Sequence, residues 1–363
     1  MQKKQKKNNH MLGQIFLLCL IALTFYVIFK NNSLSEILRA LNGLNPVYIA
    51  IAVAMIFLSI LFQALALGEP FRDFGHNISL KRKLDYAFAG FFFSAVTPSS
   101  TGGQPMQIFY MCRDNLHLSH VSVSMLLANI TYQTTLVLYG ISMYLLKFNL
   151  INEKLQGFIS LLIFGLFLNL LFALVILFML CSKKFAKNFA NGVVTLMCKM
   201  HILKDEKSAR VYILKQINEY SCCARIIRTK PMLLIKVFAF TILQMGTLYA
   251  IPFFVYKAFG LSGGSFFDLL ALQAVLYVAV SFLPLPGAVG ASESGFVKLF
   301  LVFFTEATIV PAMLVSRGIS FYLMLVVSGI AVFVMQLRKP DAPRKRRVML
   351  LRHISYGNLK HTA

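Results

Sequence analysis

Charged residues are scarce in this sequence. They make up 13% of its 363 residues, whereas a soluble domain carries about a quarter. Apolar residues make up 58%, and long apolar runs follow one another along the chain. A bilayer, unlike water, requires helices that are apolar on every side. These observations exclude a soluble protein and predict an all-α polytopic membrane protein.

Patterns that carry catalysis or metal binding are also missing from the sequence. The six cysteines are scattered apart from Cys222 and Cys223, so they form neither a metal-ligand spacing nor a disulfide framework. The seven histidines form no ligand pair with a carboxylate, and the sequence has no P-loop and no GxSxG nucleophile elbow. We therefore predict no metal, no cofactor and no catalytic residue, and we do not expect this chain alone to pump with ATP.

Six apolar segments are long enough to cross a bilayer whose hydrocarbon core is about 30 Å thick. They lie at 11–29, 46–67, 121–146, 157–181, 232–256 and 309–335. No small-residue cleavage pattern follows the first segment, which favours a retained anchor over a cleaved signal peptide. Six crossings place both termini on the same side of the membrane.

The net charge of +23 is distributed in blocks between the apolar segments. With six crossings, 28 of the 36 basic residues lie on one side. They fall in segments 1–10, 68–83, 113–120, 182–231 and 338–363. The positive-inside rule then places both termini in the cytoplasm of a bacterial inner membrane.

The positions of the basic and apolar segments divide the chain into three parts. Residues 1–10 form a basic N-terminus, residues 11–337 a transmembrane domain, and residues 338–363 a basic tail. Within the domain, the basic segment 182–231 carries apolar residues at helix-like intervals. This pattern is typical of an amphipathic helix lying on an anionic leaflet.

Two further apolar stretches, 84–112 and 266–304, are interrupted at Thr97–Pro105 and at Pro284–Glu293. The arms of the first, 84–96 and 106–112, are too short to cross a bilayer as helices. We therefore predict two re-entrant helical hairpins of opposite orientation, although two full crossings per stretch would leave the topology of the termini unchanged. Broken elements of this kind line the sites of secondary transporters.

The first break contains Thr97, Pro98, Gly102, Gly103 and Gln104. Glycines there permit backbone geometries closed to other residues, and prolines remove backbone donors. Exposed amides at a helix start bind anions, which would suit a phosphate headgroup. A tight turn without function is the alternative.

The second break contains Pro286, Gly287 and Gly290 and ends at Glu293. Glu293 can cap the following helix, or it can be a functional carboxylate at membrane depth. Its expected partner is Arg317, with Lys298 as the competing candidate. Arg317 itself either faces this site or extends its side chain to the membrane surface.

Three more polar residues are candidates for the cavity. Asn129 and Gln133 follow one another by a helical turn in segment 121–146, so with Thr134 they are expected to face the protein interior. Arg113 follows the first hairpin, where it meets lipid headgroups or ends a solvated loop.

The sequence resembles the membrane region of the lysylphosphatidylglycerol synthase family, also called flippase-like proteins. The resemblance extends over about residues 10–337. It rests on LGEPFRDFG (67–75), SAVTPSSTGGQPMQIFYMCR (94–113), LPLPGAVGASESG (283–295) and the helix that contains Arg317.

The resemblance implies binding or translocation of phosphatidylglycerol or lysylphosphatidylglycerol, and resistance to cationic antimicrobial peptides. In the family, lysine is transferred from lysyl-tRNA to phosphatidylglycerol by a cytosolic domain that follows the membrane spans. Some 26 residues follow position 337, so we expect no autonomous lysyltransferase activity. That activity is one alternative, and a membrane partner for a separate transferase is the other.

Overall fold

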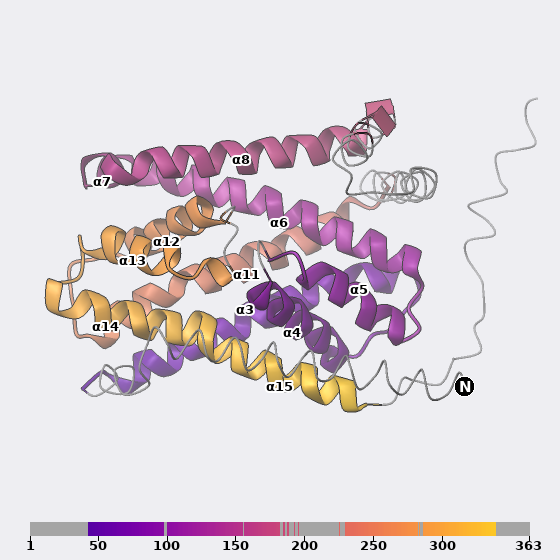
Figure 1. The fold of residues 1–363 in the computed structure, drawn as a ribbon, viewed down its shortest axis with the longest axis horizontal. Helices are drawn as coiled ribbons and strands as arrows, with labels where there is room; N and C mark the ends of the chain where they lie inside the picture. The colour runs from indigo at the N-terminus through magenta and orange to yellow at the C-terminus, as the bar shows by residue number, and fades with distance from the viewer. Residues whose placement is uncertain are drawn as a thin grey trace, which may run out of the picture.

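The computed structural model of the chain describes residues 43–97, 100–154, 156–181, 229–281, 283 and 286–338, with isolated residues between 184 and 225. All regular elements within these described ranges are helices, and the longest of them run alongside one another (Figure 1). The structure therefore has the all-α fold expected from the sequence.

Four helices are long and apolar enough to cross a membrane. They are α3 (Pro46–Asp73), α6 (Leu118–Leu146), α11 (Pro231–Ala258) and the continuous helix Glu306–Leu337. The last consists of α14 (Glu306–Arg317), η3 (Gly318–Leu323) and α15 (Met324–Leu337). They confirm four of the six spans predicted from the sequence.

The other two predicted spans have different outcomes. Helix α8 (Gln156–Cys181) occupies the span expected at 157–181, and its apolar part within the described residues is Leu162–Val175. A short helix, α7 (Phe148–Lys154), precedes it. The span expected at 11–29 and most of the basic segment 182–231 lie outside the described residues. The count of six spans therefore stays a prediction.

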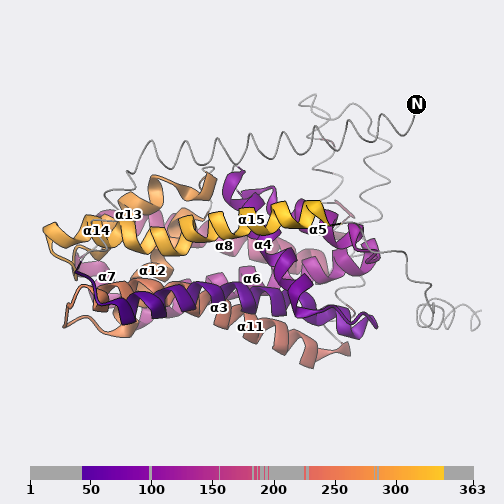
Figure 2. The ribbon, with the colours of Figure 1, turned by 90° about the horizontal axis from the view of Figure 1, so that it is seen from below.

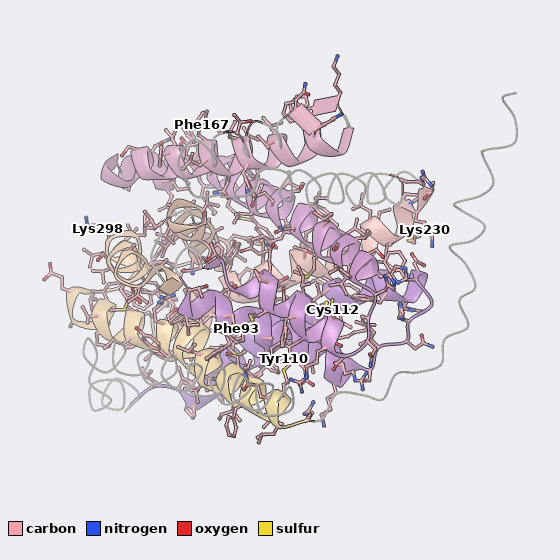
Figure 3. The ribbon with its side chains drawn as sticks, turned by 45° about the vertical axis from the view of Figure 1, so that its right-hand side comes forward. Phe93, Tyr110, Cys112, Phe167, Lys230 and Lys298 are labelled. Carbon is pink, nitrogen blue, oxygen red and sulfur yellow. The ribbon has the colours of Figure 1, made fainter. Side chains whose placement is uncertain are left out.

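Helices α3 and α11 pack against each other over much of their length, as Figure 2 shows. The backbone N–H of Asn45 donates to the carbonyl of Ala258, and Ser59 Oγ donates to the carbonyl of Gln244, so the two helices are antiparallel. Along one edge of the bundle, α8 points large apolar side chains outward, including Phe167, which is 59% exposed (Figure 3). Exposed apolar surface of this kind suits contact with lipid.

The first interrupted stretch forms a hairpin of α4 (Leu80–Val96) and α5 (Gly103–Arg113), which pack against each other. Both arms are longer than predicted, because α4 begins at Leu80 rather than at 84 and α5 begins at Gly103 rather than at 106. Gly103 and Gln104 therefore belong to the first helical turn and not to the break. Pro105 is tolerated there because the first amides of a helix have no intrahelical partner.

The second interrupted stretch forms a hairpin of α12 (Phe266–Val280) and α13 (Ala291–Phe300), with a short helix η2 (Pro286–Ala288) between them. The two hairpins lie toward opposite ends of the bundle in both views (Figures 1 and 2). Helix α4 nevertheless contacts η2, so the first hairpin reaches the second break. The prediction that the two hairpins enter the membrane from opposite sides is supported by their positions toward opposite ends of the bundle, but it stays a prediction.

Candidate functional site

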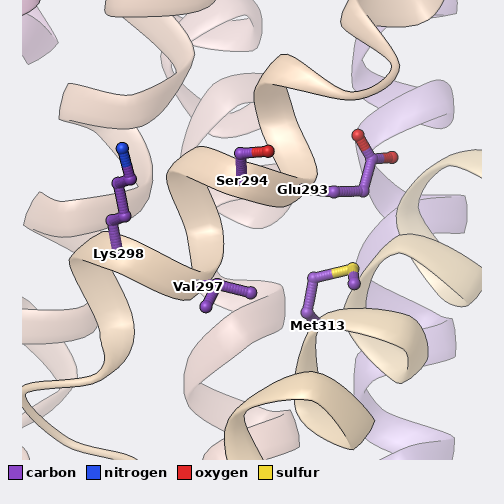
Figure 4. A pocket seen from close by; sticks show the side chains of 5 residues that line it. All are labelled: Glu293, Ser294, Val297, Lys298 and Met313. Carbon is purple, nitrogen blue, oxygen red and sulfur yellow. The ribbon is translucent and has the colours of Figure 1, made fainter.

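The second break and the last long helix are joined by an ion pair. Arg317 Nε donates to Glu293 Oε1 at 2.8 Å, and both side chains are only 15% exposed. This confirms the partner predicted for Glu293. The competing candidate, Lys298, lies five residues further along α13 and does not point toward Glu293 (Figure 4).

Glu293 uses its two carboxylate oxygens for two different contacts. While Oε1 accepts from Arg317, Oε2 accepts from the backbone N–H of Gly290 at 2.6 Å. Glu293 is in the first turn of α13, where the helix dipole stabilises a negative charge. The capping role and the ion pair, alternatives from the sequence, are therefore both present.

Arg317 turns into the bundle rather than toward the membrane surface, so the surface-directed alternative is wrong. Its Nη2 donates to the carbonyl of Gly287 at 3.0 Å, and its guanidinium lies 4.6 Å from the ring centre of Phe321. Phe321 belongs to η3, a π-helical turn that starts directly after Arg317. Such turns are often found at functional sites.

Gly287 is the backbone element that completes this arrangement. Its φ is +59°, and a Cβ at this position would lie 2.2 Å from Phe321 Cζ. Only glycine lets the break pass so close to the aromatic ring while its carbonyl faces Arg317. The neighbouring Pro286 begins η2, while Pro284 and Leu285 lie outside the described residues.

A shallow, open pocket of about 340 Å³ adjoins the carboxylate of Glu293 (Figure 4). Its lining residues are Glu293, Ser294, Val297, Lys298 and Met313. The lining thus includes an acidic, a hydroxyl-bearing and a basic residue of α13. Ser294 was not expected from the sequence, although its position one residue after Glu293 is a signal that could have found it.

Thr97 organises the first break. Its Oγ1 donates to the carbonyl of Phe93 at 2.5 Å and accepts from the backbone N–H of Gly102 at 2.9 Å. The Gly102 amide is therefore occupied by the protein, which is a correction to the anion site expected there. Pro98 and Ser99 lie outside the described residues.

Polar residues of α6 reach both hairpins. Gln104 Nε2 donates to Asn129 Oδ1 at 3.0 Å, and Gln133 Nε2 donates to Asn169 Oδ1 at 2.9 Å. Asn169 Nδ2 in turn donates to Ser281 Oγ at 3.0 Å, at the end of α12. Asn169 was missed from the sequence, although a lone amide in the middle of an apolar run was the signal.

One polar residue of α6 does not follow the expectation. Thr134 is exposed, whereas Gln133 is buried. Successive residues of a helix point about 100° apart, so Thr134 and Gln133 cannot share one face.

Arg113 ends α5 and contacts the last long helix, while its contact with headgroups stays a prediction. Its Nη2 donates to the carbonyl of Met335 at 2.8 Å and to that of Arg338, so it caps the end of α15. The last carbonyls of a helix lack intrahelical donors and carry partial negative charge. This contact ties the first hairpin to the last long helix.

Close packing within the first hairpin yields a test. A Cβ on Gly103 would lie 2.0 Å from Ser94 Oγ and 2.7 Å from the carbonyl oxygen of Gly90. We expect Gly103→Ala to destabilise the protein by about 1–3 kcal/mol, because backbone cannot move aside as a side chain can. The measurement is the free energy of unfolding in mixed micelles.

Gly318→Ala is the matched control for that substitution. Gly318 has helical φ and ψ angles, and a Cβ there would meet nothing within 4 Å. It should be neutral or stabilise by up to about 1 kcal/mol. Equal effects of the two substitutions would contradict the close approach of α4 and α5.

Several helices long and apolar enough to cross a bilayer, packed into one bundle, define a polytopic helical membrane protein. The comparison with protein families then identifies it further. Residues 12–328 match the family described as the lysylphosphatidylglycerol synthase TM region, and the chain belongs to this family. No curated protein matches the chain.

Proposed function

We propose that this protein binds anionic or aminoacylated phospholipid, such as phosphatidylglycerol or lysylphosphatidylglycerol, and moves it between leaflets of the bacterial inner membrane. In this proposal both termini lie in the cytoplasm. Movement of aminoacylated lipid to the outer leaflet is expected to give resistance to cationic antimicrobial peptides. The observation that carries the proposal is the ion pair of Glu293 with Arg317, together with the open pocket that Glu293 lines.

The charges around the pocket suit a phospholipid headgroup. Lys298, which lines the pocket, and Arg317, which is bound to Glu293 beside it, are cations that attract a phosphate. Glu293 is an anion that attracts the ammonium groups of an aminoacyl lipid. In the absence of lipid, Glu293 and Arg317 neutralise each other at 2.8 Å. When a headgroup that carries both charges binds, its phosphate takes the place of Glu293 beside Arg317, and its ammonium group takes the place of Arg317 beside Glu293. Neither ion is then left unpaired away from water.

The size and position of the pocket also support this proposal. Its volume of about 340 Å³ is within the usual range of ligand sites, roughly 300–1,000 Å³. Helix α13, which lines it, follows a break in the backbone, where a polar path can form inside a bundle without exposing backbone to lipid. Acyl chains can remain outside, against the apolar surface.

A flip assay tests the function. Purified protein is reconstituted into phosphatidylglycerol vesicles that contain a trace of fluorescent phosphatidylglycerol or lysylphosphatidylglycerol, and dithionite quenches the outer leaflet. We expect quenching beyond the outer-leaflet half with the native protein. Glu293→Gln should slow it by at least about tenfold, which corresponds to 1.4 kcal/mol.

Asp268→Asn is the matched control in this assay. Asp268 pairs with Lys147 at 2.7 Å on another part of the molecule, and asparagine can still cap α12. This variant should move lipid at the native rate. Quenching no greater than in protein-free vesicles, or a native rate for Glu293→Gln, would reject the proposal.

A further inference from the structure

Three helices bring positive charge to one carboxylate that the second break does not use. Glu69 Oε1, near the end of α3, lies 3.4 Å from Lys236 Nζ of α11 and 3.6 Å from Arg72 Nη1. The stem of Lys83, from α4, lies over Gly68, where a Cβ would be 2.4 Å from Lys83 Cδ. The ammonium group of Lys83 also interacts electrostatically with Glu69. We call Glu69, Arg72, Lys83 and Lys236 the cation cluster.

The cation cluster carries more positive charge than its carboxylate can balance. Three cations share Glu69, while the neighbouring Asp73 is paired with a further cation, Lys230, at 3.5 Å. The side chain of Glu69 is only 12% exposed, whereas those of Arg72 and Lys236 are 65% and 49% exposed. The excess charge therefore lies at the surface of the protein, where an anion can reach it.

An apolar face of α11 begins directly beside the cation cluster. Ile235, Ile242 and Leu243 are all exposed, and their spacing of seven and eight residues places them on one side of the helix. Helix α11 is long and apolar enough to cross a membrane, so these side chains are placed to contact acyl chains. Ile235 is adjacent to Lys236 in sequence, which joins the apolar face to the positive charge.

We propose that the cation cluster and this face of α11 together bind one anionic phospholipid from the surrounding leaflet. The phosphate lies between the exposed cations Arg72 and Lys236, and an acyl chain follows α11 past Ile235 toward Leu243. Charge-assisted hydrogen bonds from arginine and lysine to phosphate oxygens are strong and suit this role. The site shares no residue with the pocket beside Glu293, and it requires no movement of lipid between leaflets.

The position of the cluster favours a lipid over a soluble anionic partner. A nucleic acid or an acidic protein would meet the cations, but it would not reach apolar side chains that lie further into a membrane-crossing helix. A phospholipid has both parts in the required order, a charged phosphate followed by an apolar chain. Each lysine or arginine near an anionic leaflet attracts its lipids by about fivefold in binding constant.

Fluorescence quenching by brominated lipid tests the site directly, because the sequence contains no tryptophan. Ile235→Trp places a single reporter on the exposed face of α11. This variant is reconstituted into phosphatidylcholine vesicles, and lipid with brominated acyl chains is titrated in. We expect brominated phosphatidylglycerol to bind beside the reporter about three- to tenfold more tightly than brominated phosphatidylcholine. Equal quenching by the two lipids overturns the proposal.

Phe167→Trp is the matched control for the reporter. Phe167 and Ile235 are both 59% exposed on long apolar helices, but Phe167 lies in the middle of α8, among apolar neighbours. The two brominated lipids should quench a tryptophan at this position equally. The same preference for phosphatidylglycerol at both positions would mean a general enrichment around the protein, and it would overturn a specific site.

Removing one cation from the cluster tests its role. In the Ile235→Trp protein, Lys236→Gln or Arg72→Gln should lower the preference for phosphatidylglycerol by about fivefold. Lys257→Gln removes the same charge from the other end of α11, where Lys257 lies over the rings of Phe253 and Tyr256, and it should leave the preference unchanged. Equal losses in all three variants would show that only the net charge matters, and they would overturn the proposal.

Inorganic phosphate distinguishes a lipid site from a site for the free anion. The preference of the Ile235→Trp protein is measured in sodium phosphate and in sodium chloride of the same ionic strength. It should be equal in the two salts, because the acyl chain contributes to binding of the lipid. A preference that phosphate abolishes and chloride does not would assign the cations to free phosphate, and it would overturn the lipid site.

Discussion

Replacing Arg317 with alanine is expected to lower the free energy of unfolding by about 2–4 kcal/mol. The substitution leaves the Glu293 carboxylate without its cation and the Gly287 carbonyl without its donor. It also removes the cation from the face of Phe321, which contributes about 0.5–2 kcal/mol. The loss is below that of a completely buried pair because both side chains remain 15% exposed.

A double-mutant cycle separates the ion pair from its surroundings. Glu293→Gln, Arg317→Gln and the double variant are compared by unfolding in mixed micelles, and the double variant should be more stable than Arg317→Gln alone. Removing both charges leaves no buried ion without a partner. Additive effects would mean that the pair contributes no coupling.

The pair between Lys147 and Asp268 is the control for this cycle. Its side chains are 30% and 18% exposed, so Lys147→Gln should cost no more than about 1 kcal/mol. If Arg317→Ala costs as little, Glu293 is well hydrated in the pocket and does not depend on Arg317.

The sequence was sufficient for the long helices and for the ion pair. A bilayer requires uninterrupted apolar segments, so α3, α6, α11 and the last long helix could be located by length alone. Likewise, Glu293 and Arg317 could be paired because an ionisable group in an apolar segment needs a partner.

Contacts that depend on tertiary packing could not be located in this way. Arg113 and Met335 are 222 residues apart in sequence, and no local pattern indicates that one caps the helix of the other. The π-helical turn at Gly318–Leu323 has no proline or other local signature that separates it from an α-helix. The sequence predicts that the first break ends at Pro105, whereas α5 already begins at Gly103. Proline interrupts most helices but fits the first helical turn, so its presence does not mark the end of the break.

Gly287→Ala is the second substitution for which we expect a large effect. The residue has a φ of +59°, and alanine in this left-handed region costs about 1–2 kcal/mol. In addition, the new methyl group would lie 2.2 Å from Phe321 Cζ. Overpacking of this kind costs about 1–3 kcal/mol more, and the displaced ring no longer supports Arg317. We expect lower stability in mixed micelles and slower lipid flipping.

Gly260→Ala separates the two causes. Gly260 also has a positive φ, +69°, but a Cβ there would meet nothing within 4 Å. This variant therefore carries the backbone strain without the collision, and it leaves the second break untouched. We expect Gly287→Ala to be the less stable of the two and to flip lipid more slowly per folded molecule. Equal stability and equal rates would show that Phe321 moves aside freely, and that its ring does not hold Arg317 in place beside the second break.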